Sequence, residues 1–275
     1  MTTDSGRVTI EEGVVFGTGG GRELRCDVFT PPGNPRHAPG VLLLHGGGWR
    51  SGDRSQLRGY GVLLGREGYV CVASEYRLSP DHRWPAHLED CKVALRWMRA
   101  NAGRLGVDPE RIAVSGNSAG AHLALMLAAT PGDPDLEGEG GTPGISTKVA
   151  AVVAIYPPTD LTHLVGADPD SDDAVRTFLG PAVTAETARR ASPIAYARTD
   201  FPPTLLIHGT ADTVVSYRES VRMFEALQEA GVPVELHLYA AQPHAFDAAP
   251  AFGRQCAQIM RLFLERYVPA AVATG

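Results

Sequence analysis

The chain has 275 residues, 44% of them hydrophobic and 20% charged, which fits one large soluble domain with a substantial core as well as two small ones. A net charge of −6 argues against binding to a nucleic-acid backbone, which needs clustered lysines and arginines. The longest apolar runs, such as Val149–Tyr156, are too short to cross a bilayer. Met1–Gly6 lacks the basic and apolar regions of a signal peptide, so we expect a cytoplasmic protein.

The N-terminal third predicts a hairpin followed by alternating strands and helices. Strands at Val8–Phe16 and Glu23–Phe29 flank a glycine-rich turn, which indicates an antiparallel pair. A proline-rich loop then leads to a buried strand at Val41–Leu44. A helix over Leu57–Glu67 and a strand over Tyr69–Ser74 follow.

The same alternation continues to the C-terminus. A helix begins at Trp84-Pro85-Ala86 and runs to about Ala102, and the strand Arg111–Val114 precedes a helix over Ala121–Ala128. The remaining predicted strands are Val149–Tyr156, Pro203–His208 and Val234–Tyr239, and the remaining helices are Ser220–Ala230, closed by Gly231, and Phe252–Tyr267. Alternating β and α segments predict an α/β fold with a mostly parallel, doubly wound sheet that helices cover on both faces.

Two stretches interrupt this alternation. Residues Pro131–Thr147 are rich in Gly, Asp, Glu and Pro, which predicts a mobile surface loop. Asp160–Tyr196 is long and contains helical pieces near Asp172–Phe178 and Ala185–Arg190. Its position favours equally a small lid over a site and an ordinary helical crossover. We therefore expect a single domain over residues 1–275, with a lid insertion at about 160–196 as one of two interpretations.

The segment Gly116-Asn117-Ser118-Ala119-Gly120 joins a predicted strand to a predicted helix. A turn this tight leaves no room for side chains at its two glycines and pushes the serine hydroxyl clear of the backbone at a helix N-terminus. This pattern is the nucleophile elbow of the α/β-hydrolase fold, and it makes Ser118 the candidate nucleophile.

A serine nucleophile needs a base and an acid that orients the base. Among nine histidines, His244 is the best candidate because it lies in a loop after the strand Val234–Tyr239, late in the chain. Asp212 comes directly after a buried strand, which places it at the carboxyl edge of the sheet where Ser118 also emerges. Asp160 lies similarly after another strand and is the alternative acid. His122 and His208 are expected in packing or supporting positions.

The segment His45-Gly46-Gly47-Gly48-Trp49 follows the strand Val41–Leu44. Glycine amides are unshielded, so Gly47 and Gly48, together with the amide of Ala119, can bind a developing oxyanion. His45 is then a positioning residue rather than a base. The predicted substrate-binding residues are Trp49, Asn117, Tyr156, Phe178 and Phe246, and for the four aromatic residues a packing role is an equal alternative.

Cys26, Cys71, Cys91 and Cys256 are widely spaced within predicted strands or helices. No Cys-x-x-Cys or Cys/His ligand spacing is present, which argues against a zinc site, and we expect buried free thiols. The chemistry suggested by Ser118, Asp212 and His244 requires neither a metal nor an organic cofactor.

Several motifs together resemble the hormone-sensitive-lipase group of α/β-hydrolases, and more closely its bacterial carboxylesterase and acetyl/feruloyl-esterase-like branch. The motifs are His45–Trp49, Glu75–Pro80, Trp84–Asp90, Gly116–Gly120, Tyr156–Leu161, Ala191–Ile194, His208–Asp212 and His244–Phe246. The resemblance implies the triad Ser118, Asp212 and His244, with Gly47, Gly48 and Ala119 as oxyanion donors. Asn117 departs from the pattern, since many relatives have an acidic residue there.

The resemblance implies a serine carboxylesterase that acts through an acyl-enzyme on small-molecule esters, without nucleic-acid or membrane partners. Few residues precede His45, so we expect a reduced cap, an open pocket and short or moderately bulky esters. An arylformamidase-like or amidase activity on the same triad is the nearest alternative. A non-catalytic ligand receptor is the alternative from another class. A homodimer is compatible with all three.

Overall fold

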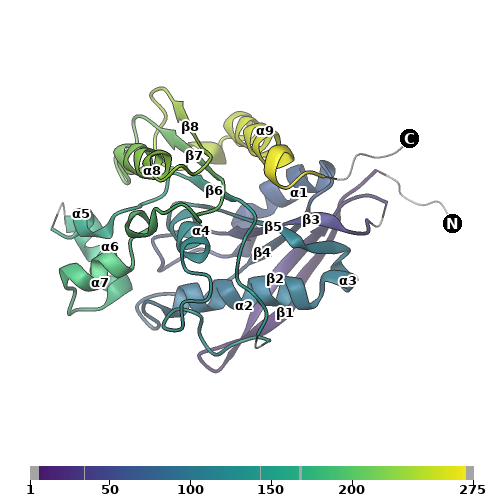
Figure 1. Ribbon diagram of the computed structural model, residues 1–275, viewed down its shortest axis with the longest axis horizontal. Helices are drawn as coiled ribbons and strands as arrows, with labels where there is room; N and C mark the ends of the chain where they lie inside the picture. The colour runs from purple at the N-terminus through teal and green to yellow at the C-terminus, as the bar shows by residue number, and fades with distance from the viewer. Residues whose placement is uncertain (1–5, 34, 143, 167–168, 271–275) are drawn as a thin grey trace.

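Eight strands form one central sheet in the computed structural model, which describes residues 6–33, 35–142, 144–166 and 169–270. Residues 1–5, to which the expectation of no signal peptide applies, lie outside these ranges, as do residues 167–168 of the predicted lid. Neighbouring strands follow the order β1-β2-β4-β3-β5-β6-β7-β8 (Figure 1). None of the helices in the described ranges is long and apolar enough to span a membrane.

The sheet confirms the predicted α/β-hydrolase architecture. Strand β1 pairs antiparallel with β2, which pairs antiparallel with β4, and every later pairing is parallel. The strands are β1 (Thr9–Gly19), β2 (Arg22–Thr30), β3 (Ala38–Leu44), β4 (Val70–Ser74), β5 (Val107–Asn117), β6 (Val152–Ile155), β7 (Thr204–Gly209) and β8 (Val234–Tyr239).

Helices cover both faces of the sheet (Figure 1). They are α1 (Arg58–Arg66), α2 (Ala86–Ala100), α3 (Ala102–Leu105), α4 (Ala119–Ala129), α5 (Leu161–Leu164), α6 (Pro169–Leu179), α7 (Ala185–Arg190), α8 (Arg218–Glu229) and α9 (Pro250–Tyr267), with 3-10 turns at Arg54–Leu57, Pro193–Tyr196 and Phe246–Ala248. Residues Leu42 and Leu44 of β3 pack with α2 and α4, whereas Val41 and Leu43 pack with α1 and α9. The alternation of side chains along a strand thus produces two cores, one on each face.

Some boundaries differ from the sequence predictions. The predicted strand Val149–Tyr156 is shortened at both ends to Val152–Ile155, and directly after it Tyr156 adopts a positive φ of 44°, which ends the extended conformation. The predicted helix ending near Ala102 divides into α2 and the short α3, which ends at Gly106 in the left-handed conformation (φ 69°). A Cβ at Gly106 would lie 2.2 Å from the carbonyl oxygen of Pro35, so the close approach of these two segments requires glycine.

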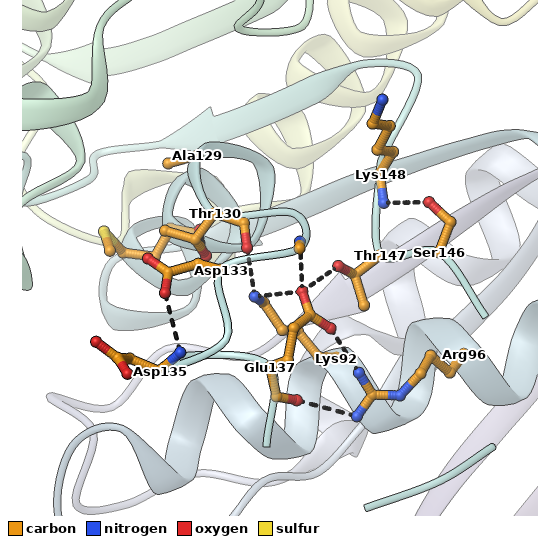
Figure 2. Close-up of polar contacts among 12 residues, drawn as sticks. Lys92, Arg96, Ala129, Thr130, Asp133, Asp135, Glu137, Ser146, Thr147 and Lys148 are labelled. Atoms are coloured by element: carbon orange, nitrogen blue, oxygen red, sulfur yellow. Dashed lines mark hydrogen bonds and ion pairs between the residues drawn. The ribbon is translucent and has the colours of Figure 1, made fainter. Parts of the chain in front are cut away.

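The segment between α4 and β6, predicted as a surface loop, contains no helix or strand over residues 131–142 and 144–147. Its Glu137 is anchored to α2: Lys92 Nζ lies 2.9 Å from Oε1 and Arg96 Nη1 lies 2.8 Å from Oε2 (Figure 2). Thr147 also donates to this carboxylate, and Lys92 donates to the Thr130 carbonyl. One carboxylate therefore balances two buried cations.

We predict that Glu137→Gln lowers the free energy of unfolding by about 2 kcal/mol, because it leaves the charges of Lys92 and Arg96 without a counterion. Urea unfolding monitored by circular dichroism measures the change. Glu139→Gln is the matched control, since Glu139 is exposed on the same loop.

The loss of stability caused by Glu137→Gln should depend on pH. Burial opposes ionisation of Glu137, but hydrogen bonds from Thr147 and Lys92 outweigh it and lower the pKa of this carboxyl. A lowered pKa means that the stabilisation is present at neutral pH and is lost as the pH falls through the folded-state value. An equal loss at pH 7 and pH 3, or an equal loss in the control, would contradict the assignment.

Candidate active site

Ser118 lies at the turn between β5 and α4 with φ 52° and ψ −122°, a strained conformation for a residue other than glycine. The backbone is held on both sides, because the Ser118 amide donates to the Ile155 carbonyl and the Ser118 carbonyl accepts from the His122 amide. Strand β6 and helix α4 together fix the serine in this conformation.

The two flanking glycines are required by close backbone approach. A Cβ at Gly116 would lie 2.4 Å from the backbone of Gly120, and a Cβ at Gly120 would lie 2.1 Å from the carbonyl oxygen of Leu44. The turn therefore packs directly against the end of β3, where the glycine-rich segment begins. The steric reason given for the motif from the sequence matches these contacts.

The structure brings Ser118, His244 and Asp212 together from three separate loops. His244 Nε2 is 3.0 Å from Ser118 Oγ, and His244 Nδ1 is 2.6 Å from Asp212 Oδ2. His244 lies in the loop after β8 and Asp212 in the loop after β7, so all three residues follow the carboxyl ends of parallel strands. The arrangement has the nucleophile–base–acid order of a serine hydrolase triad.

Asp212 is held ionised by its surroundings. The amides of Val214 and Val215 each donate to Oδ1 at 2.9 Å, and His208 Nε2 lies 3.2 Å from Oδ2. Burial alone would raise the pKa of Asp212, but the hydrogen bonds from His208, His244 and Val215 hold it well below its usual range. The carboxylate is thus available to fix the orientation of His244.

The alternative acid, Asp160, does not contact His244. It caps α5 by accepting from the Thr162 amide and lies 3.1 Å from His163 Nε2. His208, by contrast, is more than a packing residue, because it links Asp212 to Ser220 Oγ at 2.8 Å. The spacing of four residues between His208 and Asp212 was the signal in the sequence that could have revealed this contact.

The expected oxyanion donors lie beside the nucleophile. Gly47 and Gly48 have φ values of 119° and 60°, and in the part of the chain that the structure describes their amides donate to no protein group. A Cβ on the adjacent Gly46 would lie 3.3 Å from Ser118 Cβ, which shows how closely the glycine segment approaches the elbow. Ala119 begins α4, and the first amide of a helix has no partner within the helix. These three amides are available to an anion.

His45 packs against the glycine segment and holds it through a hydrogen bond. It is almost fully buried, stacks on Tyr76 with ring centroids 4.2 Å apart, and its Nδ1 lies 2.8 Å from the Gly46 carbonyl oxygen. Burial lowers the pKa of His45, so the ring is neutral at pH 7 and donates to that carbonyl. Its surroundings fit the positioning role expected from the sequence.

A cavity of about 1450 Å³ opens above Ser118. Trp49, Asn117 and Tyr156 line it, as expected from the sequence. Phe178 and Phe246 do not line the cavity. Phe178 stacks on Trp49 with ring centroids 4.4 Å apart, and Phe246 packs between the rings of Tyr239 and Phe252. Both phenylalanines are buried in the cores and not in the cavity wall.

Trp49 is held by His122, whose Nδ1 accepts from the indole Nε1 at 3.2 Å. The other ring nitrogen of His122 lies 2.7 Å from the Ala191 carbonyl oxygen and therefore carries the proton. Burial lowers the pKa of His122 to about 4, which keeps the ring neutral at pH 7 and able to accept from Trp49. His122 thus orients a wall of the cavity.

A second buried carboxylate, Asp247, was missed by the sequence analysis. Tyr60 donates to Oδ2 at 2.8 Å and Tyr156 donates to Oδ1, while Asn117 Nδ2 donates to the oxygen of Tyr156 at 3.2 Å. Burial, followed by the charge of Asp247, raises the pKa of both phenols, so they remain donors. The ring of Tyr156 also contacts the imidazole of His244, with ring centroids 4.6 Å apart. No local sequence pattern marks this network, because Tyr60 and Asp247 are 187 residues apart.

Comparison with known proteins gives one matching family model, BD-FAE, over residues 26–227. Esterase LipC of Mycobacterium tuberculosis is 37% identical over 215 residues, and esterase LipQ of the same organism is 34% identical over 259. These matches cover 74% and 89% of this chain but only 50% and 60% of the relatives, so the chain spans little more than half of their length.

Solved structures extend the comparison over nearly the whole chain. The propionate-bound esterase Est2 of Thermogutta terrifontis has a TM-score of 0.81 and 27% identity, covering 99% of this chain and 98% of its own. The same esterase has been observed phosphorylated by paraoxon. A truncated carbohydrate esterase from gut microbiota has a TM-score of 0.83 at 23% identity over 96% and 98% of the two chains, which shows a shared fold.

We predict that Gly120→Ala lowers the free energy of unfolding by about 2–3 kcal/mol and displaces the elbow, because its Cβ would overlap the Leu44 carbonyl oxygen. Chemical denaturation measures the loss. Gly103→Ala in α3 is the matched control, since its Cβ would meet nothing within 4 Å, and it should leave stability unchanged or raise it by about 0.5–1 kcal/mol. Equal effects of the two substitutions would show that the contact at Gly120 is unimportant.

Proposed function

The chain belongs to the BD-FAE family, and we propose that it is a serine carboxylesterase acting on short-chain or moderately bulky carboxylic esters. The observation that carries the proposal is the hydrogen-bonded series from Ser118 through His244 to Asp212 at the floor of a large cavity. Esterase names among the relatives and the esterase structure of similar length support the same reaction.

In the proposed first step, Ser118 Oγ attacks the ester carbonyl while His244 Nε2 takes its proton. The attack needs no rearrangement, because the two atoms are already 3.0 Å apart. Asp212 stabilises the imidazolium through the short contact with Nδ1. The amides of Gly47, Gly48 and Ala119 bind the oxyanion, a contribution that typically amounts to about 3 kcal/mol per donor.

In the second step, the imidazolium of His244 protonates the leaving alcohol and the acyl group remains on Ser118. Water then enters, loses a proton to His244 and attacks the acyl-enzyme through the same oxyanion site. Release of the acid restores the hydrogen bond between Ser118 and His244. Every group in this cycle belongs to the chain or to the solvent.

We propose that α5 and α6 form the small lid considered in the sequence analysis. Leu164 of α5 and Ala174 and Val175 of α6 line the cavity opposite α1, and Arg50 beside the glycine segment pairs with Asp173 of α6 at 2.7 Å. This ion pair links the helices to the oxyanion segment. A cover of two short helices leaves the cavity wide enough for moderately bulky esters.

We propose a cytoplasmic location for this activity. All four cysteines, at positions 26, 71, 91 and 256, are buried and free. Burial raises the pKa of the Cys26 thiol to about 12 and that of Cys256 to about 11, so both are held in the unreactive thiol form. Free thiols suit a reducing compartment, and fractionation of the native host tests the location.

We predict that the purified protein hydrolyses p-nitrophenyl acetate or butyrate and that Ser118→Ala lowers kcat by roughly 10⁴-fold or more, because no other residue replaces the nucleophile. Paraoxon should phosphorylate the wild type at Ser118, with a mass shift that the variant lacks. Ser115→Ala is the control, since Ser115 lies in β5 three residues before Ser118 but does not line the cavity.

Absence of both turnover and phosphorylation in a folded wild type would reject the esterase proposal. Faster hydrolysis of N-formylkynurenine than of any ester in the panel would favour the arylformamidase-like alternative. Ligand binding without turnover would favour a receptor. These three outcomes are distinguished by one substrate panel and one labelling experiment.

We predict that kcat/KM peaks at short acyl chains, from acetate to about hexanoate, because the lid consists only of short helices. A series of p-nitrophenyl esters from two to sixteen carbons measures the profile. A maximum on long-chain esters or triglycerides would contradict the interpretation of a small lid and an open cavity.

A further inference from the structure

Two groups of residues line the cavity above Ser118, and we call the part beside each group an arm. One arm is lined by residues of α5 and α6, and the second by residues of α1 and the start of α9, two helices that lie side by side on the same face of the sheet (Figure 1). The second arm is lined by Tyr60, Val62, Leu63 and Arg66 from α1, and by Ala248, Pro250, Gly253 and Arg254 at the start of α9. Val62, Leu63, Ala248 and Pro250 give this arm an apolar surface, and Arg66 and Arg254 are exposed cations on it.

The charges that line the whole cavity are Arg50, Arg58, Arg66, Arg254, Asp170 and Asp247. Arg50 pairs with Asp173 and Arg58 pairs with Glu12. Both oxygens of Asp247 accept from phenols. Arg66 and Arg254, by contrast, have no ion-pair partner among the described residues. Two cations thus face one arm of the cavity in a chain whose net charge is −6.

Helix stability accounts for only one of these arginines. Arg66 is in the last turn of α1, where a cation is favoured by the helix dipole. Arg254 lies close to the N-terminus of α9, where a cation gains nothing from the dipole. The helix dipole therefore does not account for the position of Arg254 on the cavity.

We propose, on the basis of the esterase function above, that the arm between α1 and α9 is a subsite for a carboxylate at the far end of the substrate. Tyr60 shares Asp247 with Tyr156, which lies against His244, and from Tyr60 to Arg66 the helix rises by roughly 9 Å at 1.5 Å per residue, which corresponds to a chain of about four to eight carbons between the ester and the anion. Val62 and Leu63 contact the methylene groups, and Arg66 and Arg254 bind the terminal carboxylate. The substrate class is a monoester of a dicarboxylic acid or an ester of an ω-hydroxy acid.

The test compares p-nitrophenyl hydrogen adipate, which carries a terminal carboxylate, with neutral p-nitrophenyl hexanoate. In the wild type we expect the adipate ester to have the higher kcat/KM. In Arg66→Gln/Arg254→Gln the ratio of the two kcat/KM values should fall about tenfold, mainly through KM, because two charge-assisted contacts are lost. Raising the salt concentration should lower the ratio in the wild type but not in the variant.

The matched control is Arg7→Gln/Arg36→Gln, which changes net charge equally at two exposed arginines outside the cavity and should leave the ratio unchanged. A second pair, 6-acetoxyhexanoate and hexyl acetate, places the carboxylate on the alcohol side. Whichever pair depends on Arg66 and Arg254 identifies the part of the ester that enters the arm, and either result supports the subsite.

A ratio that is the same in the wild type and the Arg66→Gln/Arg254→Gln variant for both pairs, while hexanoate is still hydrolysed, would overturn the subsite and leave the esterase function intact. Failure of the wild type to hydrolyse any ester would reject the esterase function instead. In that case the subsite is tested separately, by calorimetry on Ser118→Ala with monoethyl adipate as the ligand. We expect binding that is abolished when Arg66→Gln/Arg254→Gln is added. Equal binding with and without these two substitutions would overturn the subsite.

Discussion

The close approach of the Gly116–Gly120 turn to the end of β3 is the contact on which the site depends. With no Cβ at Gly120, the turn reaches the Leu44 carbonyl, and the chain that continues from Leu44 into the glycine segment is brought against Ser118. The proposed nucleophile and the proposed oxyanion amides are therefore positioned by the same backbone contact. The strain at Ser118 is offset by the β6 and α4 hydrogen bonds on either side of it.

Two buried carboxylates, Asp212 and Asp247, fix the orientation of His244 through different partners. Asp212 accepts from two backbone amides and two imidazoles, which keeps it ionised and aligned with His244. Asp247 accepts from two phenols, one of which, Tyr156, supports the ring of His244. The histidine is thus oriented at Nδ1 by a carboxylate and along its face by an aromatic ring, which reduces the reorganisation needed when it gains a proton.

The sequence predicted the sheet, the elbow and the three residues that meet at its carboxyl edge, because each of these is encoded by neighbouring residues and by the order of strands. Of the four aromatic side chains expected in the cavity wall, Trp49 and Tyr156 line the cavity and Phe178 and Phe246 do not. Trp49 is held in the cavity wall by stacking on Phe178 of α6 and by its hydrogen bond to His122 of α4, and both contacts join segments far apart in the sequence. Tyr60 of α1 meets Asp247 in the turn before α9 because these segments pack together, which no local pattern reveals.

The departure at Asn117 follows from the same long-range packing. The phenol of Tyr156 has one hydrogen, which it donates to Asp247, so its oxygen can only accept from the residue at position 117. An amide can donate there and a carboxylate cannot. A carboxylate at position 117 would also place a second negative charge near Asp247 around a single phenol. With Asp247 at this position in the network, asparagine is the residue that satisfies Tyr156, and the elbow carries no charge of its own beside the nucleophile.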